Sequence, residues 1–128
     1  MPEIKIAGSA PVESLDPEYL AELTIHQAHG ATETDLRALV DAARAELGEV
    51  SEWSATWTPW FGEHAETPEQ TALGGARLTL TFRAPNRKDG RERPRLALLA
   101  VQRVNGGRGA RHDRLKARFV RNFTAPEG

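Results

Sequence analysis

This sequence contains no cysteine, and its longest uninterrupted apolar run, Leu96 to Val101, has only six residues. The absence of cysteine excludes disulfide bonds, thiol nucleophiles and every zinc site that uses Cys ligands. An apolar run of this length cannot cross a bilayer, and Glu3 and Lys5 stand where a signal peptide would need apolar residues. We therefore expect a cytoplasmic protein that has no membrane partner.

Recognisable catalytic motifs are also lacking. His112 and Asp113 are adjacent, but neighbouring side chains diverge in a helix and point to opposite faces in a strand, so they do not form a general base with its orienting carboxylate. The glycines at 74–75, 90 and 106–109 lack the strand-to-helix setting and the lysine of a phosphate-binding loop. We expect no enzyme and no cofactor.

The length and composition indicate one globular domain over residues 1–128. A chain of 128 residues can bury about two-thirds of its unfolded surface in a single core. The hydrophobic fraction of 39% and the charged fraction of 27% are ordinary, so disorder is not favoured.

Charge is sorted along the chain, although the net charge is only −1. Residues 1–72 hold fourteen acidic and three basic residues, whereas residues 73–128 hold fourteen basic and four acidic ones, giving −11 and +10. Thirteen of the seventeen lysines and arginines lie between residues 83 and 121. Such asymmetry is typical of polyanion binding, but opposite charges can also pair within the fold.

The N-terminal half predicts two helices after a short strand over residues 3–7. For the first, residues 16–29, Asp16 is a good N-cap, Pro17 suits the first helical position and Gly30 suits the end, although a strand over 23–27 competes with it. For the second helix, Thr34 is the expected N-cap and Gly48 the expected end. Between them an apolar stripe has helical spacing: Leu36, Leu39, Val40, Ala43 and Leu47. The two would form an αα-hairpin.

Three strands are expected after Gly48. Residues 53–58 alternate, with Trp53, Ala55 and Trp57 on one face, and residues 77–83 alternate with Leu78, Leu80 and Phe82 inward. The run 96–101 is apolar on both faces, as in a central strand. We predict an α+β domain in which the N-terminal helical hairpin packs on a three- to four-stranded antiparallel sheet.

The segments that flank the run 96–101 carry most of the basic charge. Residues 85–94 contain the turn signal Asp89-Gly90 and are predicted to be the tip of a β-hairpin. The last element is a basic helix or strand: Leu115 and Phe119 suit the helix, which we slightly favour, while Ala117 and Phe123 extend an alternation that suits the strand. The candidate polyanion-binding residues are Arg87, Lys88, Arg91, Arg93, Arg95, Arg108, Arg111, Arg114, Lys116, Arg118 and Arg121.

Two smaller groups of residues are of interest as sites. Glu22, His26 and His29 would share one face of a helix and could bind a divalent metal, but this spacing is common by chance and we predict no metal site. Trp60 and Phe61 follow Pro59 into a loop and are the candidate contacts for a protein partner.

Two functions fit these features. The first is a non-enzymatic interaction or assembly module, in which acidic and basic surfaces of partners or of neighbouring copies meet and Trp60 and Phe61 anchor the contact. The second is a small nucleic-acid-binding accessory protein that uses the 85–94 hairpin and the 106–121 segment as a cationic clamp.

Overall fold

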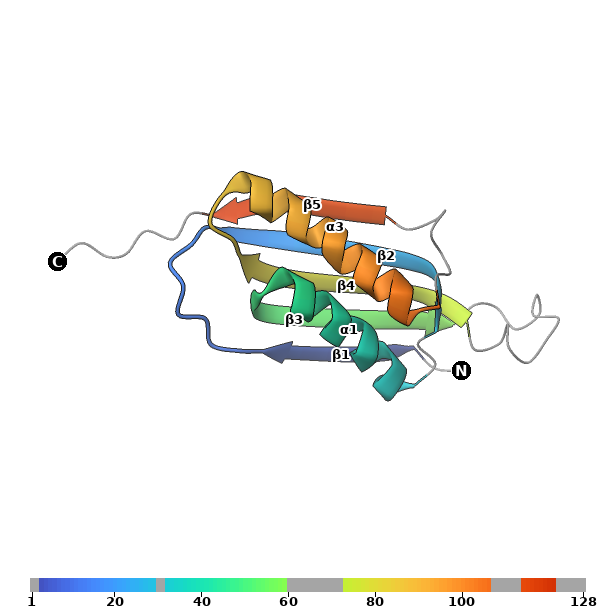
Figure 1. The fold of residues 1–128 in the computed structure, drawn as a ribbon. Coiled ribbons are helices and arrows are strands. Elements are labelled where there is room, and N and C mark those ends of the chain that lie inside the picture. The colour runs from blue at the N-terminus through green and yellow to red at the C-terminus, as the bar shows by residue number, and fades with distance from the viewer. Residues whose placement is uncertain (1–2, 30–31, 60–72, 107–113, 122–128) are drawn as a thin grey trace.

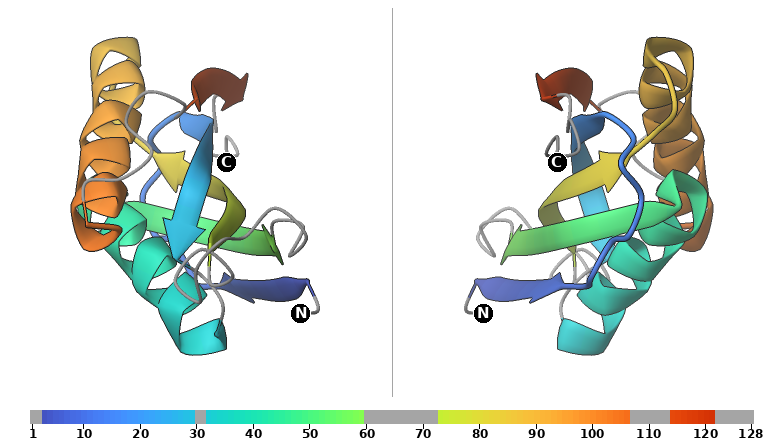
Figure 2. Two further views of the ribbon diagram at one scale, coloured as in Figure 1. Left: turned by 90° about the vertical axis from the view of Figure 1, so that its right-hand side faces the viewer. Right: turned by 90° about the vertical axis from the view of Figure 1, so that its left-hand side faces the viewer.

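Five β-strands and two α-helices make up the part of the chain that the computed structural model describes, residues 3–29, 32–59, 73–106 and 114–121. In chain order they are β1 (Ile4–Ser9), β2 (Glu18–His29), α1 (Glu33–Leu47), β3 (Glu49–Pro59), β4 (Leu73–Arg83), α3 (Arg87–Val104) and β5 (Arg114–Arg121). The strands form one antiparallel sheet with the order β1-β3-β4-β2-β5. Both helices cover the same face of it (Figure 1, Figure 2).

The elements from β2 to β5 follow the β-α-β-β-α-β order of the split βαβ arrangement, also called ferredoxin-like. Strand β4 lies between β3 and β2, and β5 forms one edge of the sheet. Strand β1 extends the opposite edge beyond β3. Because this topology supports many unrelated functions, it does not by itself identify an activity.

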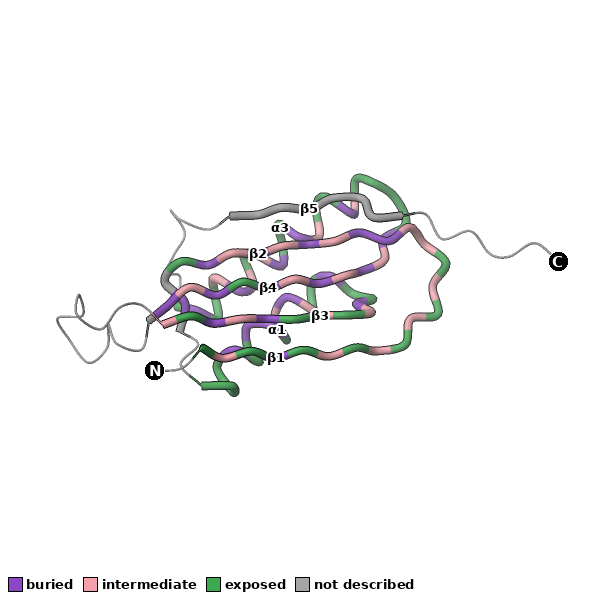
Figure 3. Tube along the Cα trace, turned by 180° about the vertical axis from the view of Figure 1, so that it is seen from behind, coloured by how far each residue is buried: buried purple, intermediate pink, exposed green. Residues whose placement is uncertain are grey.

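The hydrophobic core lies between the helices and the sheet. Tyr19, Ala21, Leu23 and Ile25 of β2 are buried, whereas the residues between them are only partly buried, and β4 alternates in the same way (Figure 3). Helix α1 adds the apolar stripe expected from its sequence: Leu36, Leu39, Val40, Ala43 and Leu47.

Helix α1 has clear start and stop signals. The Thr32 hydroxyl caps it by accepting a hydrogen bond from the Asp35 backbone N–H at 3.1 Å, so the helix begins slightly before the predicted cap Thr34. It ends at Gly48, whose φ of +84° is readily adopted only by glycine, as expected.

The predicted N-terminal helical hairpin is wrong, because residues 18–29 form strand β2. The apolar residues at 19, 21, 23 and 25 have a period of two, and β2 lies between β4 and β5 with pairing along most of its length. Asp16, expected as a helix cap, instead lies in the preceding loop, where its carbonyl accepts a hydrogen bond from Arg83 Nη1 at 2.9 Å.

The predicted strand 96–101 and hairpin tip 85–94 are also wrong, because residues 87–104 form helix α3 and Asn86 is its cap. Asn86 caps this helix, its Oδ1 accepting from the Asp89 backbone N–H at 2.9 Å. The buried stripe of the helix consists of Gly90, Pro94, Ala97 and Val101, spaced at i, i+4, i+7 and i+11. None of these residues is as large as leucine, and a Cβ at Gly90 would meet the ring of Tyr19.

The final described element, which the sequence left open with a slight preference for a helix, is strand β5. It pairs with β2 from Arg121 opposite Glu18 to Arg114 opposite Thr24. The fold is therefore α+β, with strand, helix, strand and helix alternating along the chain rather than two helices at the start.

Candidate anion-binding surface on helix α3

The structure divides the basic block 83–121 into structural and exposed cations. Arg83 and Glu18 form an ion pair at 3.1 Å, with their side chains only 11% and 9% exposed. Arg93 Nη1 donates to two backbone carbonyls, Leu47 O at 3.3 Å and Arg83 O at 3.2 Å. Arg93 thus joins the end of α1 to the end of β4, and this role sets it apart from the other cations predicted to bind polyanions.

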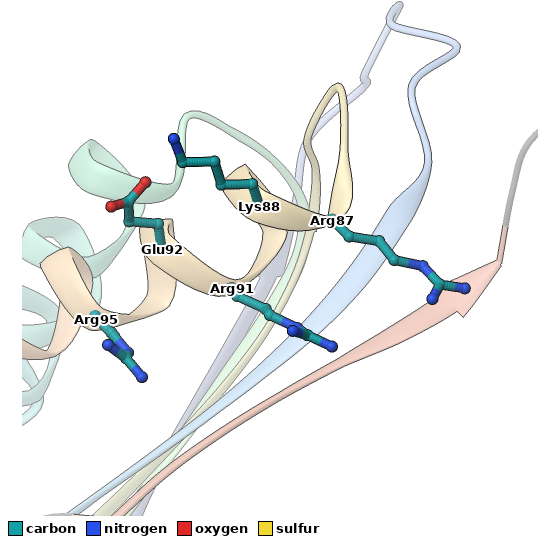
Figure 4. Close-up of a pocket in the computed structure, with 5 residues that line it drawn as sticks. All are labelled: Arg87, Lys88, Arg91, Glu92 and Arg95. Carbon is teal, nitrogen blue, oxygen red and sulfur yellow. The ribbon is translucent and has the colours of Figure 1, made fainter.

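A row of arginines remains on the first half of α3. Arg87, Arg91 and Arg95 are exposed, lie at i, i+4 and i+8, and extend from the side of the helix that faces β5 (Figure 4). Lys88 and Glu92 extend from the other side of the helix (Figure 4). These five residues line a shallow surface depression of about 570 Å³.

The charges near the start of α3 give this row a positive potential. Like charges four residues apart on a helix repel one another. Arg87 and Lys88 also lie in the first turn, where the helix dipole already contributes positive potential, and Asp89 and Glu92 balance only part of it. A bound anion would relieve both repulsions, and Arg guanidinium groups suit phosphate because their planar donors can bind two oxygens at once.

The second basic segment lies beside the first. Helix α3 packs against β5, which contains Arg114, Lys116, Arg118 and Arg121 and no acidic residue. The two basic segments predicted from the sequence are therefore neighbours in the fold, although α3 also packs on α1 (Figure 1). The basic positions 114, 116 and 118 of β5 pair with Thr24, Glu22 and Leu20, which belong to the sheet face opposite the helices. Charged residues on an edge strand also have a purely structural use, since they discourage pairing with other chains.

Four predicted site residues fall outside the described part of the chain. Arg108 and Arg111, from the glycine-rich turn, lie there, as do the candidate partner contacts Trp60 and Phe61.

The other tryptophans are structural. Trp57 is fully buried and its indole N–H donates to the Ala28 carbonyl at 3.0 Å. Trp53 packs partly buried against the core, with the Arg44 guanidinium 3.8 Å from its ring centroid. These contacts confirm the prediction that Trp53 and Trp57 lie on the core side of their strand.

The fold does not bring the possible metal-binding trio of Glu22, His26 and His29 together on a helix. Glu22 and His26 lie four residues apart on strand β2, and an extended strand separates such positions by about 13 Å. Among residues 3–29, 32–59, 73–106 and 114–121, no group of three His, Cys, Asp or Glu side chains could hold a metal ion.

The sheet face opposite the helices is polar. On β3 it carries Glu52, Ser54, Thr56 and Thr58, and on β4 it carries Arg77, Thr79 and Thr81. The corresponding positions of β1 and β2 likewise contain no Phe, Tyr or Trp. Single-stranded RNA is commonly bound by aromatic stacking on such a sheet, so this face lacks the residues for that mode.

No protein-family model, curated protein or solved structure matches this chain. A function can therefore be argued only from the residues of the site. Within the described ranges, neither helix is long and apolar enough to span a membrane.

Sequence reasoning missed the outward face of α3. Leu96 and Leu99 are predicted to lie in a buried central strand, but they are 47% and 53% exposed. The available signal was their helical spacing with Glu92 and Arg103, since 92, 96, 99 and 103 fall at i, i+4, i+7 and i+11.

Proposed function

We propose that this chain is a small, non-enzymatic accessory protein that binds the phosphate backbone of nucleic acid. The observation that carries the proposal is the exposed row of Arg87, Arg91 and Arg95 on the first half of α3. From Arg87 to Arg95 the helix rises about 12 Å, so the row fits an extended ligand with several charges better than a single phosphate group. The depression is open rather than enclosed, which also argues against a small-molecule site.

This binding would be independent of base sequence. The surface offers guanidinium and ammonium groups, which contact phosphates, and the polar sheet face supplies no aromatic residues for stacking on bases. The affinity would fall steeply as the salt concentration rises, because each neutralised phosphate releases counterions.

The test measures binding of a mixed-sequence DNA duplex by fluorescence anisotropy over a range of salt concentrations. The triple variant R87Q/R91Q/R95Q should bind at least about tenfold more weakly at low salt and should lower the salt slope by about 2 to 3. The matched control K5Q/R37Q/R77Q removes the same charge from positions elsewhere on the surface and should retain most of the affinity. Absence of binding by the unmodified protein at low salt, or equal losses in both variants, would overturn the proposal.

Assembly is a second candidate function, and one observation favours it. Helix α3 leaves Leu96, Leu99 and Val104 between 47% and 53% exposed, although large aliphatic side chains on a monomer are more often covered. An assembly function of this kind would use α3, whereas the sequence pointed to Trp60 and Phe61.

A further inference from the structure

The outward face of α3 carries an ordered stripe of four residues that ends in opposite charges. Glu92, Leu96, Leu99 and Arg103 follow one another at i, i+4, i+7 and i+11. The buried stripe, which runs from Gly90 to Val101, lies on the opposite side of the helix. This is the spacing at which two helices pack side by side, with apolar residues in the middle of the seam.

The stripe is complementary to itself in only one orientation. If two copies of α3 pack antiparallel about a two-fold axis between residues 97 and 98, Leu96 of each copy meets Leu99 of the other. The same axis places Glu92 of each copy beside Arg103 of the other. A parallel pairing would instead put Glu92 against Glu92 and Arg103 against Arg103. Within the described residues, neither Glu92 nor Arg103 forms an ion pair inside its own chain.

We propose that a second copy of this chain docks antiparallel on the outward face of α3, forming a two-fold symmetric dimer. The apolar centre is Leu96 and Leu99, and two Glu92–Arg103 pairs between the copies set the orientation. This dimer specifies the partner for the proposed assembly function, and it rests on that function. It does not depend on nucleic-acid binding. Glu92 borders both this seam and the depression on α3, whereas the arginine side chains extend from the other side of the helix (Figure 4).

The contact is small, because each copy contributes one side of one helix. Such an interface lies at the low end of specific protein interfaces, so the dimer should dissociate on dilution. The mass in solution, measured by sedimentation equilibrium without nucleic acid, should rise with concentration from 14.1 kDa toward twice that value. A mass that stays at 14.1 kDa up to the highest soluble concentration would overturn the proposal.

Charge reversal tests the orientation of the dimer. E92R makes both ends of the stripe basic and R103E makes both ends acidic, so each variant alone should dimerise at least about tenfold more weakly. An equimolar mixture of E92R and R103E should recover association, because every cross-contact then joins opposite charges. The double variant E92R/R103E should recover it as well, since it only exchanges the two signs.

Two further variants test whether the contact uses this face of α3. R37E reverses an exposed charge on α1 and should leave association unchanged, whereas L99E should abolish it. Circular dichroism spectra that match the unmodified protein show that each variant is folded. If a dimer forms but neither single reversal weakens it, or if the mixture associates no better than its components, the antiparallel α3 contact is wrong. DNA binding by monomeric variants would leave the anion-binding proposal standing in either case.

Discussion

The two helices of this protein cover the same face of the same sheet, yet the side chains that they bury differ in size. Helix α1 buries leucines at three positions, Leu36, Leu39 and Leu47, with Val40 and Ala43 between them. Helix α3 buries Gly90, Pro94, Ala97 and Val101, while Leu96 and Leu99 remain exposed. Helix α1 thus uses its large side chains for the core of its own chain, whereas α3 keeps two of its leucines on the surface, where they are free to contact other molecules.

The comparison is tested most directly by shortening one leucine on each helix. L39A should lower the free energy of unfolding by about 2–5 kcal/mol, because Leu39 is 1% exposed and its loss leaves a cavity. L99A should change it by less than about 0.5 kcal/mol at a protein concentration where the chain is monomeric. Urea denaturation measures both, and similar losses would show that Leu99 belongs to the core after all.

A second contrast lies within α3, between two arginines two positions apart. R93A should cost about 1.5–3 kcal/mol of stability, because the Leu47 and Arg83 carbonyls lose a charged donor in a partly buried site. R91A should leave stability nearly unchanged and weaken DNA binding instead. Thermal and urea unfolding measure both variants. Equal destabilisation by R91A and R93A would contradict the assignment of a structural role to Arg93 and a surface role to Arg91.

The smallest effect concerns how closely α3 approaches the sheet. Alanine normally stabilises a helix relative to glycine by about 1 kcal/mol. G90A should instead destabilise this protein by about 1–3 kcal/mol, because the added Cβ would overlap the ring of Tyr19, which is buried and stacked on Phe82. G75A is the matched control, since nothing lies within 4 Å of a Cβ placed there. A stabilising G90A would mean that α3 can move away from the sheet without cost.

The sequence predicted correctly those elements whose pattern is made of large residues. The leucine stripe identified α1, and the alternation in residues 53–58 and 77–83 identified β3 and β4 with their buried faces. The short strand at the N-terminus was also correct, and it forms β1.

The errors arose where local signals competed. Asp16 and Pro17 resemble a helix start, and Leu20 and Leu23 have helical spacing, but the alternation from Tyr19 to Ile25 and pairing on both sides make the segment a strand. In α3, glycine and proline are read as signs of a turn, yet here they provide the small surface that lets the helix lie close to Tyr19.

The residues of the candidate site could be predicted from the sequence, but their arrangement could not. Their charge alone identifies Arg87, Lys88, Arg91 and Arg95, but the sequence places them on or beside a hairpin tip over residues 85–94. Only the helix gives the arginine row its spacing, and only the fold shows that Arg93 is used internally.

The position of β2 in the sheet has a consequence for how the protein folds. Its two neighbours come from much later in the chain: Thr24 pairs with Arg77 on β4 and with Arg114 on β5, about 50 and 90 residues downstream. Contacts of such long range slow folding, because the loop between them must close before pairing stabilises it. During synthesis β2 is made before both of its neighbours, so its backbone groups cannot pair within the sheet until β4, and then β5, has been made.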